Sequence, residues 1–178
     1  MYPSRMMTDH VDVRPATQSD CHDLAEIHAL AWYGAYQGLL QGVELQRLVA
    51  RRTADWWQGA LHRGVNITVL EVLGKPAGYA TFGTSRLSAL PEGGEIYELY
   101  IRPDHQGLGF GRQLFLAVRK DLAARQPHNG LAVQVLSENQ PARNFYRALG
   151  GKLAASSCYR SGDTTHDLSI YAWPGDTR

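Results

Sequence analysis

Hydrophobic residues recur along the chain with two periods, one typical of amphipathic helices and one typical of strands. Four stretches carry apolar residues every three or four positions, and they lie near 24–32, 43–62, 112–125 and 141–149. Shorter stretches are alternating, β-branched or aromatic, and they lie near 11–13, 66–73, 77–83, 95–101, 131–136, 152–159 and 166–173. Residues 1–10 carry neither pattern and predict a flexible lead-in.

The order of these stretches predicts the fold class. It is strand, two helices, three strands, helix, strand, helix and two strands. Three consecutive strands in mid-chain argue against a sheet in which strands and helices strictly alternate. We therefore expect an α/β protein with a mixed sheet, folded as a single domain over residues 11–174. A chain of 178 residues buries enough surface to hold such a core without a metal or a disulfide.

The charge balance and the cysteines exclude several classes of protein. Lysine and arginine number 18 and aspartate and glutamate 17, which gives a net charge of +1. A nearly neutral chain argues against a nucleic-acid binder and against an electrostatic membrane anchor. Cys21 and Cys158 lie far apart in the sequence and outside any metal-binding spacing, which indicates a reducing, cytoplasmic compartment. We expect no metal site, no membrane span and no signal peptide.

Three glycines mark the segment with the clearest chemistry. Residues 106–112 read QGLGFGR, follow a predicted strand and open a predicted helix. Glycines let the backbone approach a ligand closely, and the first N–H groups of a helix are free and lie at its positive end. This combination predicts a site for a phosphate or pyrophosphate. The spacing fits neither a P-loop nor the G-x-G-x-x-G of dinucleotide-binding folds, whereas a methyltransferase loop stays open as an alternative.

The same segment is the first of two motifs that resemble one family. Gln106, Gly109 and Gly111 match Q/R-x-x-G-x-G/A, the central motif of the GCN5-related N-acetyltransferase superfamily. Residues 139–150 read NQPARNFYRALG and resemble the family's N-x-x-A-x-x-F-Y-x-x-x-G segment, and the resemblance covers roughly residues 10–173. It implies a central, twisted, mostly antiparallel sheet of about six or seven strands with a splayed parallel pair, flanked by about four helices.

The resemblance also implies that acetyl-coenzyme A is the acetyl donor. Backbone N–H groups of residues 107–112 would hold its pyrophosphate. The backbone of residues 99–101 would pair with the pantetheine arm like an added strand, and Asn139 would bind that arm from the other side. The implied cofactor-binding residues are Leu99, Tyr100, Ile101, Gln106, Gly107, Leu108, Gly109, Phe110, Gly111, Arg112, Asn139, Ala142 and Phe145.

Two residues are candidates for proton transfer. Tyr146 occupies the tyrosine position of the second motif. The resemblance implies that it is a general acid, which donates a proton to the departing coenzyme A thiolate. Glu95 resembles the base glutamate of histone-acetylating members, which lies at the same offset before Gln106. Glu98 is the rival base, and water alone is a third alternative. Strand alternation places Glu95 and Glu98 on opposite faces unless a bulge intervenes, so we expect only one of them to face the cleft.

The acceptor is the least determined part of the prediction. Trp32 and Tyr36, together with Glu98, would suit a cationic amine, although aromatic residues at helical spacing also fit a packed core. We expect acetyl transfer to a primary amine by direct attack in a ternary complex. The alternatives are a non-catalytic acyl-coenzyme A sensor on the same fold and an S-adenosylmethionine-dependent methyltransferase. The sequence does not choose among a small amine, an amino acid, an antibiotic and a protein N-terminus, and it leaves a longer acyl group and a homodimer open.

Overall fold

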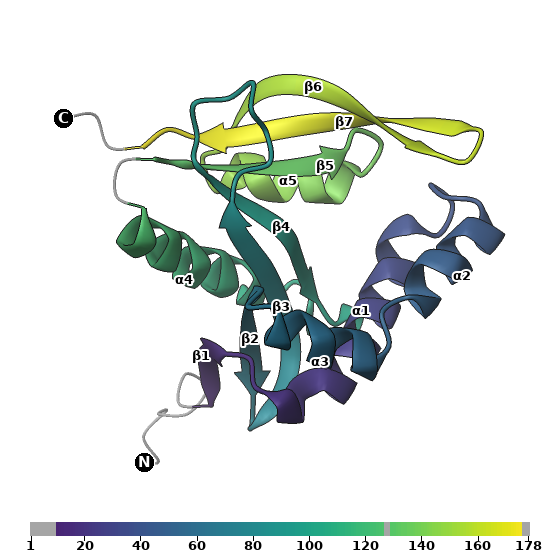
Figure 1. The fold of residues 1–178 in the computed structure, drawn as a ribbon, viewed down its shortest axis with the longest axis vertical. Coiled ribbons are helices and arrows are strands. Elements are labelled where there is room, and N and C mark those ends of the chain that lie inside the picture. Colours follow the sequence, from purple (N-terminus) through teal and green to yellow (C-terminus); the bar gives the residue numbers. More distant parts are fainter. Residues whose placement is uncertain (1–9, 127–128, 176–178) are drawn as a thin grey trace, which may run out of the picture.

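A computed structural model describes residues 10–126 and 129–175 of the chain, so residues 1–9 of the predicted lead-in lie outside the described residues (Figure 1). A seven-stranded sheet forms the centre, and α-helices flank it. The strands are β1 Val11–Pro15, β2 Asn66–Val72, β3 Lys75–Thr84, β4 Gly94–Ile101, β5 Leu131–Leu136, β6 Lys152–Ser161 and β7 Thr164–Trp173. The α-helices are α1 Cys21–Tyr36, α2 Gly42–Ala50, α3 Ala54–His62, α4 Phe110–Arg125 and α5 Gln140–Ala148. Two short 3-10 turns span Gln18–Asp20 and Pro103–His105.

The predicted helical stretch at 43–62 is divided into two helices, so five α-helices are described where about four were expected. α2 ends at Ala50, and Thr53 begins α3 as its N-cap, where its hydroxyl accepts a hydrogen bond from the Trp56 N–H at 3.2 Å. Threonine suits this position because its oxygen satisfies a backbone N–H that has no partner within the helix. The turn between the two helices contains Arg52, which contacts the candidate site described below.

The sheet is antiparallel except for its central pair. The strand order is β1-β2-β3-β4-β5-β7-β6, and β4 runs parallel to β5. These two strands pair only where Gly94, Glu95 and Ile96 face residues 131–133. Beyond that point residues 97–101 have no β5 partner among the described residues, and the β5–β7–β6 part of the sheet turns away from β1–β4 (Figure 1). The mixed, mostly antiparallel sheet with a splayed parallel pair is therefore confirmed.

A β-bulge in β4 changes which face its side chains occupy. Thr81 of β3 pairs with Glu98, but the next residue, Phe82, pairs with Ile96, so Tyr97 is an extra residue. Ile96 packs in the hydrophobic cluster under α4, so Glu95 beside it points to the opposite face. Because the extra residue shifts the alternation by one, Glu98 also points to that opposite face. Both glutamates thus lie on the side of the sheet that carries α1.

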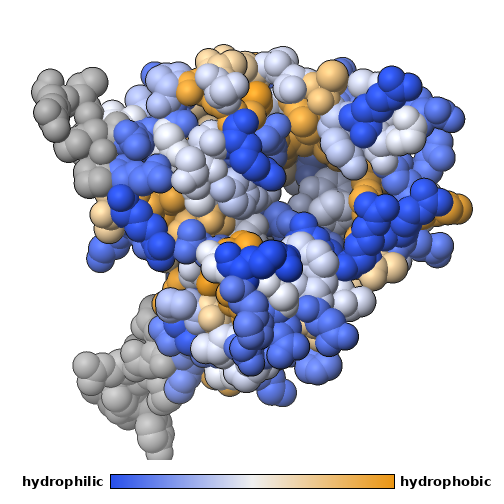
Figure 2. Space-filling view, in the orientation of Figure 1, coloured by the Kyte–Doolittle hydropathy of each residue, from blue (hydrophilic) through white to orange (hydrophobic). Residues whose placement is uncertain are grey.

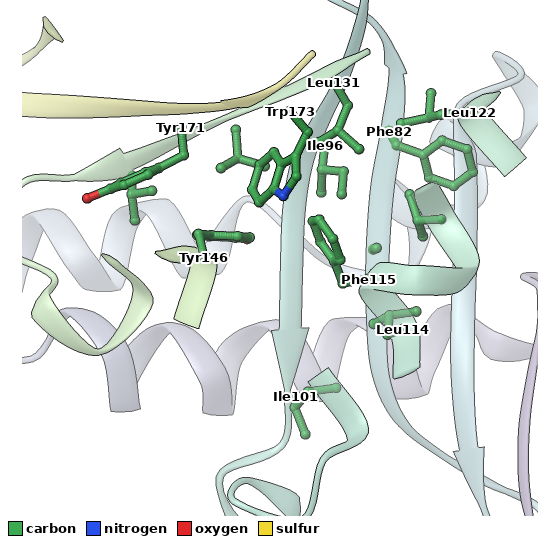
Figure 3. Close-up of a cluster of buried hydrophobic side chains, with 14 of the residues drawn as sticks. Phe82, Ile96, Ile101, Leu114, Phe115, Leu122, Leu131, Tyr146, Tyr171 and Trp173 are labelled. Carbon is green, nitrogen blue, oxygen red and sulfur yellow. The ribbon is translucent and has the colours of Figure 1, made fainter. Parts of the chain in front are cut away.

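Two hydrophobic clusters hold the helices against the two faces of the sheet. Figure 3 shows the larger cluster, in which Phe115 of α4 packs against Trp173 of β7 with 5.0 Å between ring centroids. The second cluster packs α1 and α3 on the other face, with Trp57 edge-on to Tyr79 of β3 at 4.9 Å. Burial of apolar surface stabilises by about 25 cal/mol per Å², so these clusters fix the helices that carry the site. Among the described helices, none combines the length and the apolar character needed to cross a membrane.

Candidate functional site

The glycine loop, residues 106–112, leads from the end of β4 into α4. Gly107 and Gly109 adopt left-handed backbone conformations with φ of 77° and 84°, and a Cβ added at either would meet nothing within 4 Å. The backbone N–H groups of residues 107–112 have no backbone acceptor among the described residues. Alternating left-handed glycines at a helix N-terminus aim such N–H groups at a common point. The loop is therefore a preformed cradle for an anion such as a diphosphate.

Side-chain contacts hold this loop against its surroundings. The Gln106 amide Nε2 donates a hydrogen bond to the carbonyl of Ile101 at 2.9 Å, which ties the loop to the last residue of β4. Gly111 lies in the first turn of α4, and a Cβ there would sit 3.1 Å from the ring of Phe145 on α5. The absence of a side chain at Gly111 therefore lets α5 pack closely on the start of α4. Leu108 and Arg112 are exposed at the surface of the loop.

The unpaired part of β4 belongs to one of the two strands that diverge, and α5 begins shortly after the other, β5. Leu99 and Tyr100 lie on β4 beyond the last pairing with β5. On the β5 side, Asn139 is 8% exposed and caps α5, since its Oδ1 accepts a hydrogen bond from the Ala142 N–H at 3.2 Å. Its amide Nδ2 remains able to donate. An anion cradle beside an unpaired strand edge fits a diphosphate that continues into an extended, hydrogen-bonding arm.

Tyr146 lies on α5 and packs beside Trp173 and Phe115 (Figure 3). The residue is 7% exposed, and its hydroxyl is neither hydrogen-bonded among the described residues nor sealed from solvent. Burial, and next the nearby Tyr36, raise the pKa of Tyr146 well above the usual range of a phenol. The hydroxyl stays protonated at neutral pH and can donate a hydrogen bond.

Glu95 is fully buried and its carboxylate is already saturated with donors. Oε2 accepts from the Arg86 backbone N–H at 2.7 Å and from its Nε at 3.4 Å. Oε1 accepts from the Arg86 Nη2 at 2.9 Å and from the Gln134 Nε2 at 3.1 Å. Gln134 lies on β5, just beyond the last residue that pairs with β4. Glu95 therefore connects the two strands at the point where they begin to separate.

Glu98 has a different environment. Its side chain is 12% exposed, its Oε1 accepts a hydrogen bond from Arg52, and its Oε2 accepts one from the Tyr79 hydroxyl at 2.8 Å. The Arg52 guanidinium lies over the Trp56 ring, 3.8 Å from its centroid. Glu98 is thus an accessible carboxylate with one bond to each oxygen, so it can still accept another donor.

The aromatic residues predicted for the acceptor gather beside Glu98. Trp32 stacks edge-on to Tyr36 at 4.9 Å, and the Tyr36 hydroxyl bonds to that of Tyr100 at 2.8 Å. Glu98 is close enough to contribute to the raised pKa values of Tyr36 and Tyr100, for which burial is the largest cause. We call Glu98, Arg52, Tyr79, Tyr100, Tyr36 and Trp32 the Glu98 cluster. Figure 2 shows that the surface is hollowed between the part of the molecule with α5 and β7 and the part with α1–α3.

Sequence patterns did not indicate the roles of His28, Tyr79 and Arg52. His28 lies on the buried face of α1, where a titratable side chain among apolar ones is an available signal. Tyr79 occupies an ordinary strand position, and Arg52 lies in the turn that the prediction of one continuous helical stretch had overlooked. Within residues 10–126 and 129–175, no three His, Cys, Asp or Glu side chains gather as metal ligands.

The chain has relatives among bacterial proteins. The model of a family described as FR47-like protein matches residues 85–161. The chain is 30% identical over 165 residues to the uncharacterized N-acetyltransferase YuaI of Bacillus subtilis (strain 168), which covers 92% of this chain and 93% of that one. It is 30% identical over 142 residues to the L-amino acid N-acyltransferase MnaT of Escherichia coli (strain K12), which covers 79% and 78%.

Solved structures share the fold at lower identity. The PaiA N-acetyltransferase of Thermoplasma acidophilum, in complex with coenzyme A, matches with a TM-score of 0.74 and 14% identity over 92% of this chain and 99% of that one. YncA of Salmonella typhimurium, solved with its cofactor acetyl-CoA, matches with a TM-score of 0.67 and 22% identity over 96% of both chains. These likenesses establish the fold.

Proposed function

The chain belongs to the GCN5-related N-acetyltransferase superfamily, and from this premise we propose that it transfers the acetyl group of acetyl-coenzyme A to a primary amine by direct attack in one ternary complex. The observation that carries the proposal is the divergence of β4 from β5 next to the glycine loop. Among the described residues, this divergence leaves one edge of residues 97–101 unpaired, and the N–H groups of residues 107–112 in the following loop have no backbone acceptor.

The chain's own groups account for donor binding. The N–H groups of the glycine loop favour the negative charge of a diphosphate. The free edge of β4 aligns an extended arm as an added strand, and Asn139 contributes an amide from the opposite side. Acetyl-coenzyme A, when bound, supplies a thioester carbonyl that is activated for attack by an amine. Phe145 and Ala142 on α5 pack against the larger hydrophobic cluster, and the Phe145 ring lies beside Gly111 of the glycine loop.

The geometry supports separate roles for Tyr146 and Glu98. Tyr146 keeps its proton at neutral pH and offers it to a departing thiolate. An alkyl ammonium has a pKa near 10 and must lose a proton before it attacks, so an ionised carboxylate at the proposed site is a suitable acceptor. Glu98 is accessible and has capacity for another donor, whereas Glu95 is buried and fully bonded. We therefore assign the base role to Glu98 and a structural role to Glu95.

The acceptor that fits best is an α-amino acid. Arg52 and Glu98 present opposite charges side by side, and Arg52 uses only its Nη2 for Glu98 among the described residues. Its other N–H groups can bind a carboxylate while Glu98 binds the neighbouring ammonium. The E. coli relative carries an L-amino acid in its name, which agrees with this assignment. Trp32 and Tyr36 would contact the remainder of the substrate.

The test measures acetyl-coenzyme A-dependent thiol release with an amino acid and with the amine that lacks only its carboxylate, such as phenylalanine and phenethylamine. We expect the amino acid to be preferred at least about tenfold in kcat/KM, because a charge-assisted bond to Arg52 contributes about 1.5–3 kcal/mol. Arg52→Gln should abolish this preference. Arg51→Gln is the matched control, because Arg51 is the exposed neighbour on the same turn.

Other outcomes separate the alternatives. Equal turnover of both acceptors would reject the amino acid assignment but retain the acetyltransferase. Thermal stabilisation by coenzyme A without turnover of any amine would indicate a non-catalytic sensor. Stabilisation by S-adenosylmethionine instead of coenzyme A would indicate a methyltransferase.

A further inference from the structure

A chain of hydrogen bonds leads from Glu98 into the protein interior. The Tyr79 hydroxyl donates to the Glu98 Oε2 at 2.8 Å, and the His28 Nδ1 lies 2.8 Å from the same hydroxyl. Tyr79 is fully buried and His28 is 1% exposed. This series of hydrogen bonds ends at the His28 Nε2, a buried atom without a hydrogen-bond partner among the described residues.

The direction of each proton in this chain follows from the donors available. An ionised carboxylate can only accept, so the single hydroxyl proton of Tyr79 points to Glu98. The hydroxyl oxygen must then accept from His28, which requires the Nδ1–H tautomer of the imidazole. Burial, and next the positive charge of Arg52, lower the pKa of His28 to about 3, so the ring is neutral at physiological pH. The direction of donation is therefore fixed: His28 donates a hydrogen bond to Tyr79, and Tyr79 donates one to Glu98.

We propose that Tyr79 and His28 are positioning residues for Glu98, which hold its carboxylate oriented so that its free lone pairs meet the ammonium group of the acceptor. The inference rests on the proposed function and adds the supporting pair to it. A hydrogen bond to the ionised form of a carboxylate favours that form. Donation by His28 polarises the Tyr79 hydroxyl and strengthens its bond to Glu98. Neither residue needs to touch the substrate.

The charged and titratable groups around Glu98 come from several elements. They are His28 and Tyr36 from α1, Arg52 from the α2–α3 turn, Tyr79 from β3, Arg86 from the β3–β4 connection and Tyr100 from β4. Between pH 5 and 9 the arginines stay cationic. The three tyrosines stay neutral because burial raises their pKa values, and His28 stays neutral as well. If a variant shows an acidic limb displaced from that of the wild type, these neighbouring groups are therefore not the cause, and the change is attributed to Glu98.

The test is the pH dependence of kcat/KM in the full chain and its variants. Tyr79→Phe removes a donor to the ionised carboxylate, so the acidic limb should move to higher pH, with a severalfold larger loss of kcat/KM on that limb than on the plateau. His28→Leu should move the limb in the same direction by less. His28→Asn keeps an N–H near the position of Nδ1 and should restore the wild-type profile. Glu98→Gln should remove the limb, and coenzyme A affinity by calorimetry should stay unchanged in all of them.

Tyr171→Phe is the matched control. Tyr171 is also fully buried, and its hydroxyl accepts a single side-chain hydrogen bond among the described residues, from the Nε of Arg143 on α5 at 3.1 Å. The acidic limb of the Tyr171→Phe variant should lie at the same pH as that of the wild type. If Tyr79→Phe lowers kcat without moving the limb, or if Tyr171→Phe moves it equally, the positioning role is rejected.

A second measurement does not depend on the stability of any variant. Nitrogen-15 NMR of histidine-labelled wild-type protein should show His28 neutral and in the Nδ1–H tautomer from pH 5 to 8. Detection of the Nε2–H tautomer overturns the proposed chain even if the enzyme is active. If instead the tautomer is as expected and no amine is acetylated, the proposed function fails while the hydrogen-bond chain stands.

Discussion

At the scale of single residues, Glu95 and Glu98 carry the same carboxylate on one strand but differ in the hydrogen-bond donors that surround it. Glu95 is closed in by four donors from Arg86 and Gln134, whereas Glu98 receives two and keeps part of its surface open. A general base needs free lone pairs within reach of the proton that it removes. The difference in environment is therefore the reason that we propose Glu98, and not Glu95, as the proton acceptor.

Tyr146→Phe tests the general acid at the same scale. The substitution keeps the buried ring and removes only the hydroxyl, so we expect kcat to fall about 100-fold, within the usual range for a lost acid, and coenzyme A affinity to change little. Because the pKa of Tyr146 is raised, ionisation of this tyrosine should not reduce wild-type kcat at any pH below about 10. Tyr159→Phe, on the exposed part of β6, serves as the control. Wild-type kcat in the Tyr146 variant would remove the assignment.

At the scale of elements, the proposed binding of an anion by the glycine loop depends on the backbone conformation of the loop. Gly107 and Gly109 have left-handed backbone geometry, the N–H groups of residues 107–112 have no backbone acceptor in the described part of the chain, and Gln106 bonds the loop to β4. An anion bound there need not order the loop, so less conformational entropy is lost on binding. The bulge at Tyr97 acts at this scale as well, since one extra residue places Glu98 on the face with α1.

Gly109→Ala tests the loop. A side chain at φ 84° costs about 1–2 kcal/mol of backbone strain, and relief of that strain would turn the N–H groups away from their common point. We expect coenzyme A affinity to fall at least about fivefold by calorimetry. Gly74→Ala is the matched control: Gly74 has φ 75° and open space around its Cβ position, but lies in the β2–β3 turn. Equal losses of affinity in both variants would show a general effect on stability.

At the scale of the whole molecule, the proposed site depends on the division of the sheet into two parts. β1–β4 carry α1 and α3 on one face, and β5–β7–β6 turn away after three paired positions (Figure 1). The proposed site draws on both parts, with Tyr146 on α5 and Glu98 on β4. Glu95 and Gln134 join the two parts at the point of divergence.

Glu95→Gln tests whether this junction is structural. An amide in place of the carboxylate leaves some of the surrounding N–H groups without an acceptor, so we expect the free energy of unfolding to fall by about 1–3 kcal/mol in urea denaturation. With Glu98 as the base, kcat of the folded variant should stay within a few-fold of wild type. Glu138→Gln, at an exposed position, should change neither property. A 100-fold loss of kcat at unchanged stability would return the base role to Glu95.

The sequence by itself determined the elements and the anion-binding loop. Apolar periodicity reflects which side of a helix or strand is buried, and the glycines at 107, 109 and 111 act on backbone within their own segment. These are local effects, so they can be read along the chain. The two motifs at 106–112 and 139–150 added the family and the position of Tyr146.

Only the tertiary structure decided which carboxylate is available and what supports it. The register of β3 on β4 creates the bulge, and no residue type in β4 predicts it. Tyr79 follows His28 by 51 positions, and Arg52 precedes Glu98 by 46, yet both pairs are in hydrogen-bond contact. Such contacts depend on how helices and strands pack against each other, and packing is a property of the folded chain that local periodicity does not contain.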